Sequence, residues 1–153
     1  MELEQQLQKL IEDAPQEDNT AQLVQVIGPL LLNIAQNFRH KEYYIVQTLD
    51  KRWQTSTWAA TTGERPERTL LYAYCSLQDA TNSIPMPKDP WLMALPVPVV
   101  HIIFQLLAME PVESVIFWEE AGPKLGTELK RSELQLAVQN HLLQLAGPPA
   151  DLA

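Results

Sequence analysis

The residues that could do nucleophilic or acid–base chemistry in this chain are few. Cys75 is the single thiol, and the three histidines are His40, His101 and His141. A catalytic cysteine needs a base and a group that orients this base, and no family spacing connects Cys75 with a histidine here. Because a free cysteine is commonly a small buried hydrophobic residue, we expect an inert thiol. The alternative is an enzyme or a small-ligand binder that uses a pocket near Cys75 and His101.

Each histidine also has a structural explanation. His101 and His141 lie on apolar stretches of helical length, outside any His-x-x-x-His or Glu-x-x-His motif. We expect each of them to pack with one ring nitrogen hydrogen-bonded. His40 lies between Arg39 and Lys41 at the end of a predicted helix, where a cation complements the helix dipole.

Four carboxylates surround the short apolar run Val115–Trp118, namely Glu110, Glu113, Glu119 and Glu120. Such a group could hold a hard cation or act as an acid–base pair. The alternation of oxygen ligands with glycine that marks a calcium loop is missing, so we expect solvated strand ends instead. The glycines match neither common phosphate-binding pattern. The sequence therefore predicts no catalytic, cofactor-binding or metal-binding residue, and no cofactor.

Aromatic residues are concentrated in the segments that we predict as the first strands. If helices cover one face of the sheet and leave the other open, some of these rings are exposed and anchor an interface. The alternative is that helices cover both faces, or that the tryptophans fill the edge of the core. The residues that we expect to bind a partner are Tyr43, Asp50, Trp53 and Trp58.

The elements that must position these residues are organised around the stretch Asp89–Glu120. Trp91–Leu95 and Val115–Trp118 are short apolar runs, and Val99–Met109 between them is apolar over a helical length. Prolines mark the entry to this helix and its exit. A strand, a helix and a strand with apolar runs at both ends are typical of a buried βαβ-type unit.

Two helices are predicted before the first strand. Apolar residues recur at helical spacing in residues 2–13, and Ala14-Pro15 ends this helix because the residue before proline disfavours helical geometry. Asn19 or Thr20 can cap a longer second helix with one apolar face. Gly28-Pro29 lies in its middle and predicts a kink or a break.

The sheet is predicted from three segments rich in β-branched and aromatic residues. Tyr43–Leu49 and Trp53–Thr62 indicate a β-hairpin that turns at Asp50-Lys51-Arg52. A third strand, Thr69–Tyr74, leads into a short helix capped by Ser76. A hairpin so early in the strand region is expected at a sheet edge, where strand addition by another chain is possible.

The C-terminal part is expected to close the domain. Thr127–Lys130 is a possible last short strand, and Ser132 with Gln135 resembles a capping box that begins a final helix. Gly147 and the prolines after it end this helix, so residues 147–153 are expected to be a frayed tail.

The order of these segments resembles a known family. LLYAYCSLQDA reads as a strand with a Ser-capped helix, ALPVPVVHIIFQLL as a strand and a helix, and EPVESVIFWEEAGPKLGTELKRSEL as a strand, a glycine turn and a capped helix. This order is similar to the N-terminal domain of the SseB family of small α/β proteins, over roughly Tyr43–Leu143. The chain has Glu113-Ser114 where that family tends to have Asp-Gly, and Trp118 where it tends to have Asn. A looser resemblance, tied to no motif, is to small cyanobacterial proteins such as the CcmS-type assembly chaperones of carboxysomes. Neither family implies a catalytic site.

Composition restricts the classes of partner. The 153 residues carry a net charge of −8, with a pI of about 4.8. This balance disfavours a nucleic-acid surface, which needs clustered Lys and Arg, and adhesion to an anionic membrane. One cysteine allows no internal disulfide, which fits a reducing compartment, the cytoplasm. The N-terminus does not resemble a signal peptide, and no apolar run is long enough to span a bilayer.

Taken together, these patterns predict a single α/β (α+β) domain over residues 1–146. The helices of residues 1–40 precede a sheet-containing core, residues 43–146, with a mixed or antiparallel sheet of four to six strands, a central helix and a C-terminal helix. We expect a non-enzymatic protein-binding or chaperone-like assembly factor that acts through an aromatic and acidic surface. The alternatives are the ligand-binding or catalytic pocket near Cys75 and His101, and a structural homodimer without ligand.

Overall fold

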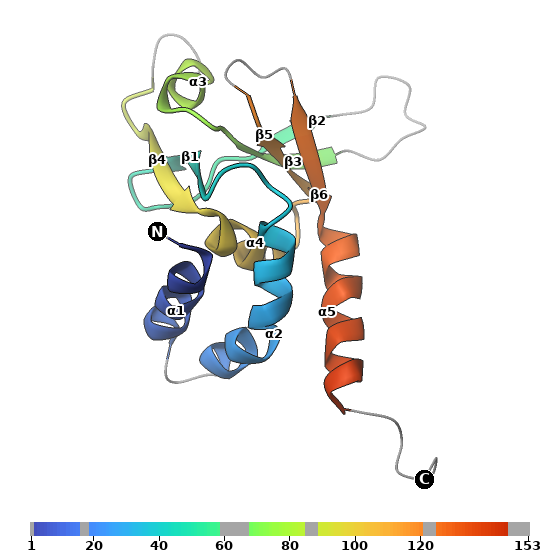
Figure 1. Ribbon diagram of the computed structural model, residues 1–153. Coiled ribbons are helices and arrows are strands. Elements are labelled where there is room, and N and C mark those ends of the chain that lie inside the picture. Colours follow the sequence, from blue (N-terminus) through green and yellow to red (C-terminus); the bar gives the residue numbers. More distant parts are fainter. Residues whose placement is uncertain (1, 16–18, 59–67, 85–88, 121–124, 147–153) are drawn as a thin grey trace, which may run out of the picture.

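The computed structural model describes residues 2–15, 19–58, 68–84, 89–120 and 125–146 (Figure 1). The helices are α1 (Leu3–Asp13), α2 (Thr20–Ala35), α3 (Leu77–Asn82), α4 (Val99–Ala108) and α5 (Arg131–Ala146). The strands are β1 (Glu42–Thr48), β2 (Ser56–Trp58), β3 (Arg68–Ala73), β4 (Leu92–Pro98), β5 (Ser114–Trp118) and β6 (Gly126–Lys130). The expected α/β class is confirmed. The frayed tail that we expect at residues 147–153 lies outside the described residues.

The strands form two sheets. β1 and β4 make an antiparallel pair, and the other sheet has the order β2-β3-β5-β6, in which only β3 and β5 are parallel. Tyr44 and Tyr74 exchange two backbone hydrogen bonds of 2.7 and 3.0 Å, so the two sheets meet where β1 passes the end of β3. Figure 1 shows the strands gathered at one end of the molecule, whereas α1, α2 and α5 lie at the other end.

The predicted βαβ unit is wrong in its pairing, although its three elements lie where the sequence placed them. β4 pairs with β1, whereas β5 lies between β3 and β6, so the strands on either side of α4 belong to different sheets. The parallel partner of β5 is β3, four elements earlier in the chain. Apolar runs show that a strand is buried, but they do not determine which strand lies beside it.

The structure confirms the predicted hairpin only at its turn and in the residues next to the turn. Thr48 and Arg52 close a three-residue loop through the bond from Thr48 N to Arg52 O (2.9 Å), and Gln47 then bridges Trp53. Gln54 N still donates to Val46 O of β1 (2.9 Å), and beyond this residue the chain leaves β1, so that β2 pairs with β3 instead. β1 pairs with β4 along its whole length and has the isolated bridges to Tyr74 and Trp53 on its other side, so neither of its sides is fully open.

α4 is the centre of the hydrophobic core. Its fully buried residues are Val99, Val100, Ile102, Ile103 and Leu106. α1 and α2 pack beside it, and a Cβ atom on Gly28 would lie only 2.7 Å from Leu7 Cδ2, so glycine permits this close approach. α2 runs continuously through Pro29, and the break that the sequence suggested there does not occur.

The predicted helix caps have different outcomes, and at the start of α2 the Asn19 side chain forms no capping hydrogen bond. The Ser76 hydroxyl accepts a hydrogen bond from the Asp79 backbone N–H (3.1 Å), which confirms the cap of α3. The capping box at Ser132 is wrong, because α5 begins one residue earlier at Arg131. The Arg131 guanidinium donates to the backbone oxygens of Leu106 (3.1 Å) and Leu107 (2.8 Å), and so it satisfies carbonyls at the C-terminal end of α4.

Candidate functional site

The four-stranded sheet has one buried face and one partly open face. Side chains alternate between the faces of a strand, and the residues of β3 and β5 that face the core are fully buried. They are Leu71, Ala73, Val115 and Phe117. The alternate residues Tyr72, Ile116 and Trp118 are half-buried, so they lie on the opposite, outer face.

Aromatic rings form a row across this outer face. The rings of Tyr72 and Trp118 have centroids 6.1 Å apart with an interplanar angle of 17°, and the Tyr74 ring lies 6.3 Å from that of Tyr72. A Cβ atom on Gly126 would lie 2.9 Å from Cζ3 of Trp118, so the indole lies over β6 at a residue without a side chain. Tyr74, Tyr72 and Trp118 are called the aromatic row below.

An ionic cluster borders the aromatic row. Arg68 contacts Glu113 and lies 2.7 Å from Glu128, and the Ser114 hydroxyl donates to Glu128 at 2.5 Å. The hydrogen bond from Ser114, followed by the charge of Arg68, lowers the pKa of Glu128 below its usual value. Ser114 is buried, but the three charged side chains are partly exposed, so their ion pairs add little to stability.

The predicted partner-binding residues occupy very different environments. The expectation that the Tyr43 ring is exposed is wrong, because Tyr43 has no exposed surface and its hydroxyl binds Glu119. Asp50 is exposed in the turn after β1, and Trp53 is half-buried against the core. The Trp58 backbone pairs with Arg68 in β2, and its side chain lies outside what the structure describes.

A second region of interest is the turn that carries Asp50. The loop Leu49–Lys51 contains a β-turn, closed by Lys51 N and Thr48 O (2.9 Å), and Lys51 has a φ of 66°. A three-residue hairpin loop of this type places its last residue in the left-handed region, which glycine adopts most easily. The Thr48 hydroxyl and Arg52 Nε (3.1 Å) both donate to Asp50, and the bond from Thr48 is the main cause of the lowered pKa of Asp50.

Next to this turn lies a pocket of about 610 Å³, called the Trp53–His101 pocket below. The Trp53 and His101 rings both line it and contact each other, with centroids 5.8 Å apart. Burial lowers the pKa of His101 below its ordinary value of 6.5, with a smaller opposing effect from the charge of Asp13. Within the described chain, the His101 ring has no hydrogen-bond partner, so the expectation of a satisfied ring nitrogen is wrong for this histidine.

A larger pocket of about 780 Å³ adjoins it between α1, the start of α2 and α4. Pro98, His101 and Gln105 line both pockets. Cys75 lines neither of them, so a combined site of Cys75 and His101 is not formed. Cys75 packs instead against the hydrophobic core at the end of β3, and burial raises the pKa of its thiol above the ordinary value.

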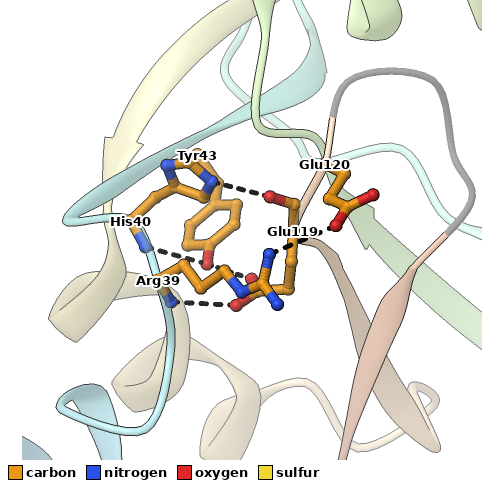
Figure 2. A network of polar contacts seen from close by, with 5 residues as sticks. All are labelled: Arg39, His40, Tyr43, Glu119 and Glu120. Carbon is orange, nitrogen blue, oxygen red and sulfur yellow. Dashed lines mark hydrogen bonds and ion pairs between the residues drawn. The ribbon is translucent and has the colours of Figure 1, made fainter.

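A polar network joins distant segments, with Tyr43 and Glu119 buried at its centre and Arg39 and Glu120 exposed at its edge, as Figure 2 shows. Glu119 is only 5% exposed and accepts hydrogen bonds from the Tyr43 hydroxyl and from Arg39 N (2.8 Å). His40 Nε2 lies 2.9 Å from Glu119 O, and Arg39 also forms a 3.4 Å ion pair with Glu120. Burial, followed by the bond to Glu119, raises the pKa of Tyr43. Every member has a hydrogen-bond or ion-pair partner inside the network, which indicates that the network stabilises the fold rather than binding a ligand.

The four carboxylates around β5 do not form one site. The expectation of solvated strand ends is wrong for Glu119, which is buried, while Glu110, Glu113 and Glu120 are exposed. Glu113 contacts Arg68, Glu119 contacts Tyr43, and Glu120 contacts Arg39. Among the residues that the structure describes, no three His, Cys, Asp or Glu side chains are placed to hold a metal ion together. In the same part of the chain, each helix is too short or too polar to cross a lipid bilayer.

Sequence reasoning missed three residues of these sites. Trp118 was assigned only to a buried strand, and Lys51 only to a turn. Gln47 also went unnoticed, although it is buried and lines the Trp53–His101 pocket. A usable signal of the pocket was the four-residue spacing of His101 and Gln105, which places two polar residues on one face of an otherwise apolar helix.

No protein-family model, curated protein or solved structure matches this chain. The resemblance to the SseB family and the looser one to CcmS-type proteins therefore stay expectations from the sequence. Function has to be argued from the geometry of the two regions described above.

Proposed function

We propose that this chain is a protein-binding module that uses the outer face of its four-stranded sheet. The observation that carries this proposal is the aromatic row, three half-buried rings that lie side by side across β3 and β5. Tyrosine and tryptophan supply large contact areas with little loss of conformational entropy, and they are over-represented among the residues that dominate binding energy.

The edge of the same sheet favours an extended segment as the partner. β6 is the last strand in the sheet order, and all of its residues except Leu129 are exposed. Arg131 N donates to Glu113 O (2.8 Å). Because hydrogen-bonded pairs alternate along an antiparallel ladder, the backbone groups of the odd-numbered residues of β6 bond to β5. Gly126 and Lys130 therefore direct backbone groups away from the sheet, where another chain can pair with them.

A partner strand beside β6 would bring its side chains next to the indole of Trp118. The opposite choice, strand addition at β4, is disfavoured by Pro96 and Pro98, which have no N–H to donate. The chain's net charge of −8 favours a partner that is basic overall. A protein of this kind would work in the cytoplasm as an assembly factor or chaperone-like adaptor.

Quantitative affinity capture with the wild-type chain and two charge-inserting variants tests this proposal. Tyr72→Lys places a charge within the aromatic row, and Trp91→Lys is the matched control because Trp91 is 65% exposed on a separate loop. We expect Tyr72→Lys to lose specific partners that Trp91→Lys retains, with both variants folded by circular dichroism. Equal capture by both variants would contradict the proposal.

Self-association is measured separately by analytical ultracentrifugation of the same three proteins. If a dimer forms in the wild type and dissociates only in Tyr72→Lys, the partner on this face is a second copy of the chain. A ligand-binding role is the second candidate, and the Trp53–His101 pocket is the specific observation that favours it.

A further inference from the structure

We propose that the Trp53–His101 pocket binds a small organic acid, with an apolar or aromatic body and one anionic head group. This site lies on elements other than the outer sheet face, so it does not depend on the proposed protein-binding function. Its volume of about 610 Å³ lies within the usual range of small-molecule sites.

The body of such a ligand is matched by an apolar wall and two rings. Leu95, Val97 and Met109 line one part of the pocket, and the Trp53 and His101 rings approach each other at an angle of 56°. Ligand sites of this kind are mainly apolar, and a few polar groups fix the orientation of the bound molecule.

Gln47 is the most specific sign of a ligand. It is only 5% exposed, it lines the pocket, and no residue in the described ranges forms a hydrogen bond with its side-chain amide. Every fully enclosed side-chain nitrogen or oxygen of the described residues has a hydrogen-bond partner. The Gln47 amide must therefore open onto the pocket. A ligand oxygen in the pocket can accept hydrogen bonds from its N–H groups.

The charges at the pocket mouth favour an anion. Lys51 and Arg52 line the pocket, and none of its lining residues in the described chain is acidic, although the whole chain carries a net charge of −8. Asp50 contacts Arg52 through Nε at 3.1 Å, so the two terminal amino groups of this guanidinium extend beyond the ion pair. A local excess of cations on an acidic protein attracts an anion to this position.

The backbone at Lys51 has a φ of 66°, which the three-residue loop requires of its last residue. A glycine would adopt this conformation without strain, whereas the lysine in this position adds a cation beside the pocket. His101 also lines the pocket, and burial lowers the pKa of its ring, so the neutral imidazole can donate or accept a hydrogen bond there.

The experiment uses naphthylacetate as the probe, with its neutral amide, naphthylacetamide, as the matched control ligand. Binding is measured by titration calorimetry and mapped by amide NMR on the full chain. We expect naphthylacetate to bind about tenfold more tightly than the amide, and to shift the Gln47 side-chain and Trp53 indole signals. Naphthyl phosphate is titrated in parallel, because either acid belongs to the proposed class and the two affinities distinguish a carboxylate from a phosphate.

Two variants separate the contributions of the site. Gln47→Leu should weaken naphthylacetate and naphthylacetamide alike, whereas Arg52→Gln should weaken only the two acids. Lys130→Gln removes an exposed cation on β6 and should change none of these affinities. Each variant is first checked for native folding by its NMR spectrum, and Arg52 is exposed enough for its replacement to leave the fold intact.

Three results would overturn the proposal. The first is equal affinity for naphthylacetate and its amide, and the second is an absence of binding to either acid at millimolar concentration. The third is a set of ligand-induced NMR shifts centred on Leu10 and Phe104. The last result would place the ligand in the neighbouring pocket between α1 and α4.

Discussion

The Tyr43 hydroxyl donates a hydrogen bond to the Glu119 carboxylate inside the protein, and this contact joins β1 to the residue that follows β5. Tyr43→Phe removes the donor and leaves a buried carboxylate with fewer partners. We expect the free energy of unfolding to fall by about 1–3 kcal/mol, measured by urea denaturation. Tyr44→Phe is the control, because in the described chain its hydroxyl forms no hydrogen bond. Equal effects of the two changes would show that Glu119 does not need this donor.

The core role of α4 can be tested at two adjacent positions. Ile103 is fully buried, whereas Phe104 is partly buried and lines the pocket beside α1. We expect Ile103→Ala to lower the free energy of unfolding by about 2–5 kcal/mol, because a cavity remains in the core. Phe104→Ala should lower the free energy of unfolding by less, because the space left by the ring opens onto an existing pocket rather than forming an enclosed cavity. Unchanged denaturation midpoints for both variants would mean that α4 is not the centre of the core.

Replacement of Lys51 should separate stability from ligand binding. Lys51→Gly removes the strain of the left-handed backbone conformation, which glycine adopts easily. We therefore expect the free energy of unfolding to rise by about 0.5–1 kcal/mol. The same variant should bind naphthylacetate more weakly because a cation is lost. As a control, Lys9→Gly within α1 should lower stability by about 1 kcal/mol. Loss of stability in Lys51→Gly would show that its side chain supports the turn.

The burial of His101 predicts a specific pH dependence. Its pKa is lower in the folded protein than in the unfolded chain, so at acidic pH the folded state binds fewer protons than the unfolded chain does. The stability associated with neutral His101 is complete above about pH 6.5, and it is lost as the pH falls through the folded-state pKa. His101→Gln should therefore lose less stability than the wild type between about pH 7 and 5.5, measured by denaturation at each pH. Parallel curves would contradict the assigned burial.

Cys75 should be a slow and dispensable thiol. Burial, assisted by the charge of Asp79, raises its pKa, so little thiolate is present at neutral pH. We expect its reaction with a thiol reagent to be slower than that of glutathione in the native state and to match it after denaturation. Cys75→Ala should keep partner capture and naphthylacetate binding unchanged. Fast labelling of Cys75 in the native protein, accompanied by loss of partner capture or of naphthylacetate binding, would indicate that Cys75 is a functional residue.

The sequence alone determined the local features whose causes lie within a few residues. The end of α1 before Pro15, the cap of α3 at Ser76 and the apolar span of α4 follow from backbone geometry, side-chain hydrogen bonding and hydrophobic periodicity. The turn after β1 was found for the same reason. The expected α/β class with up to six strands also followed from these local patterns.

The tertiary structure decided which strands are neighbours and which side chains remain accessible. β4 pairs with β1 rather than forming a unit with β5, because strand pairing depends on contacts between residues far apart in the sequence. Tyr43 and Trp118 are both aromatic strand residues, yet Tyr43 is sealed against Phe117 while Trp118 lies over Gly126 on the outer face. Alternation along a strand assigns residues to two faces, but only the packing of α4 against one face determines which of them is the surface.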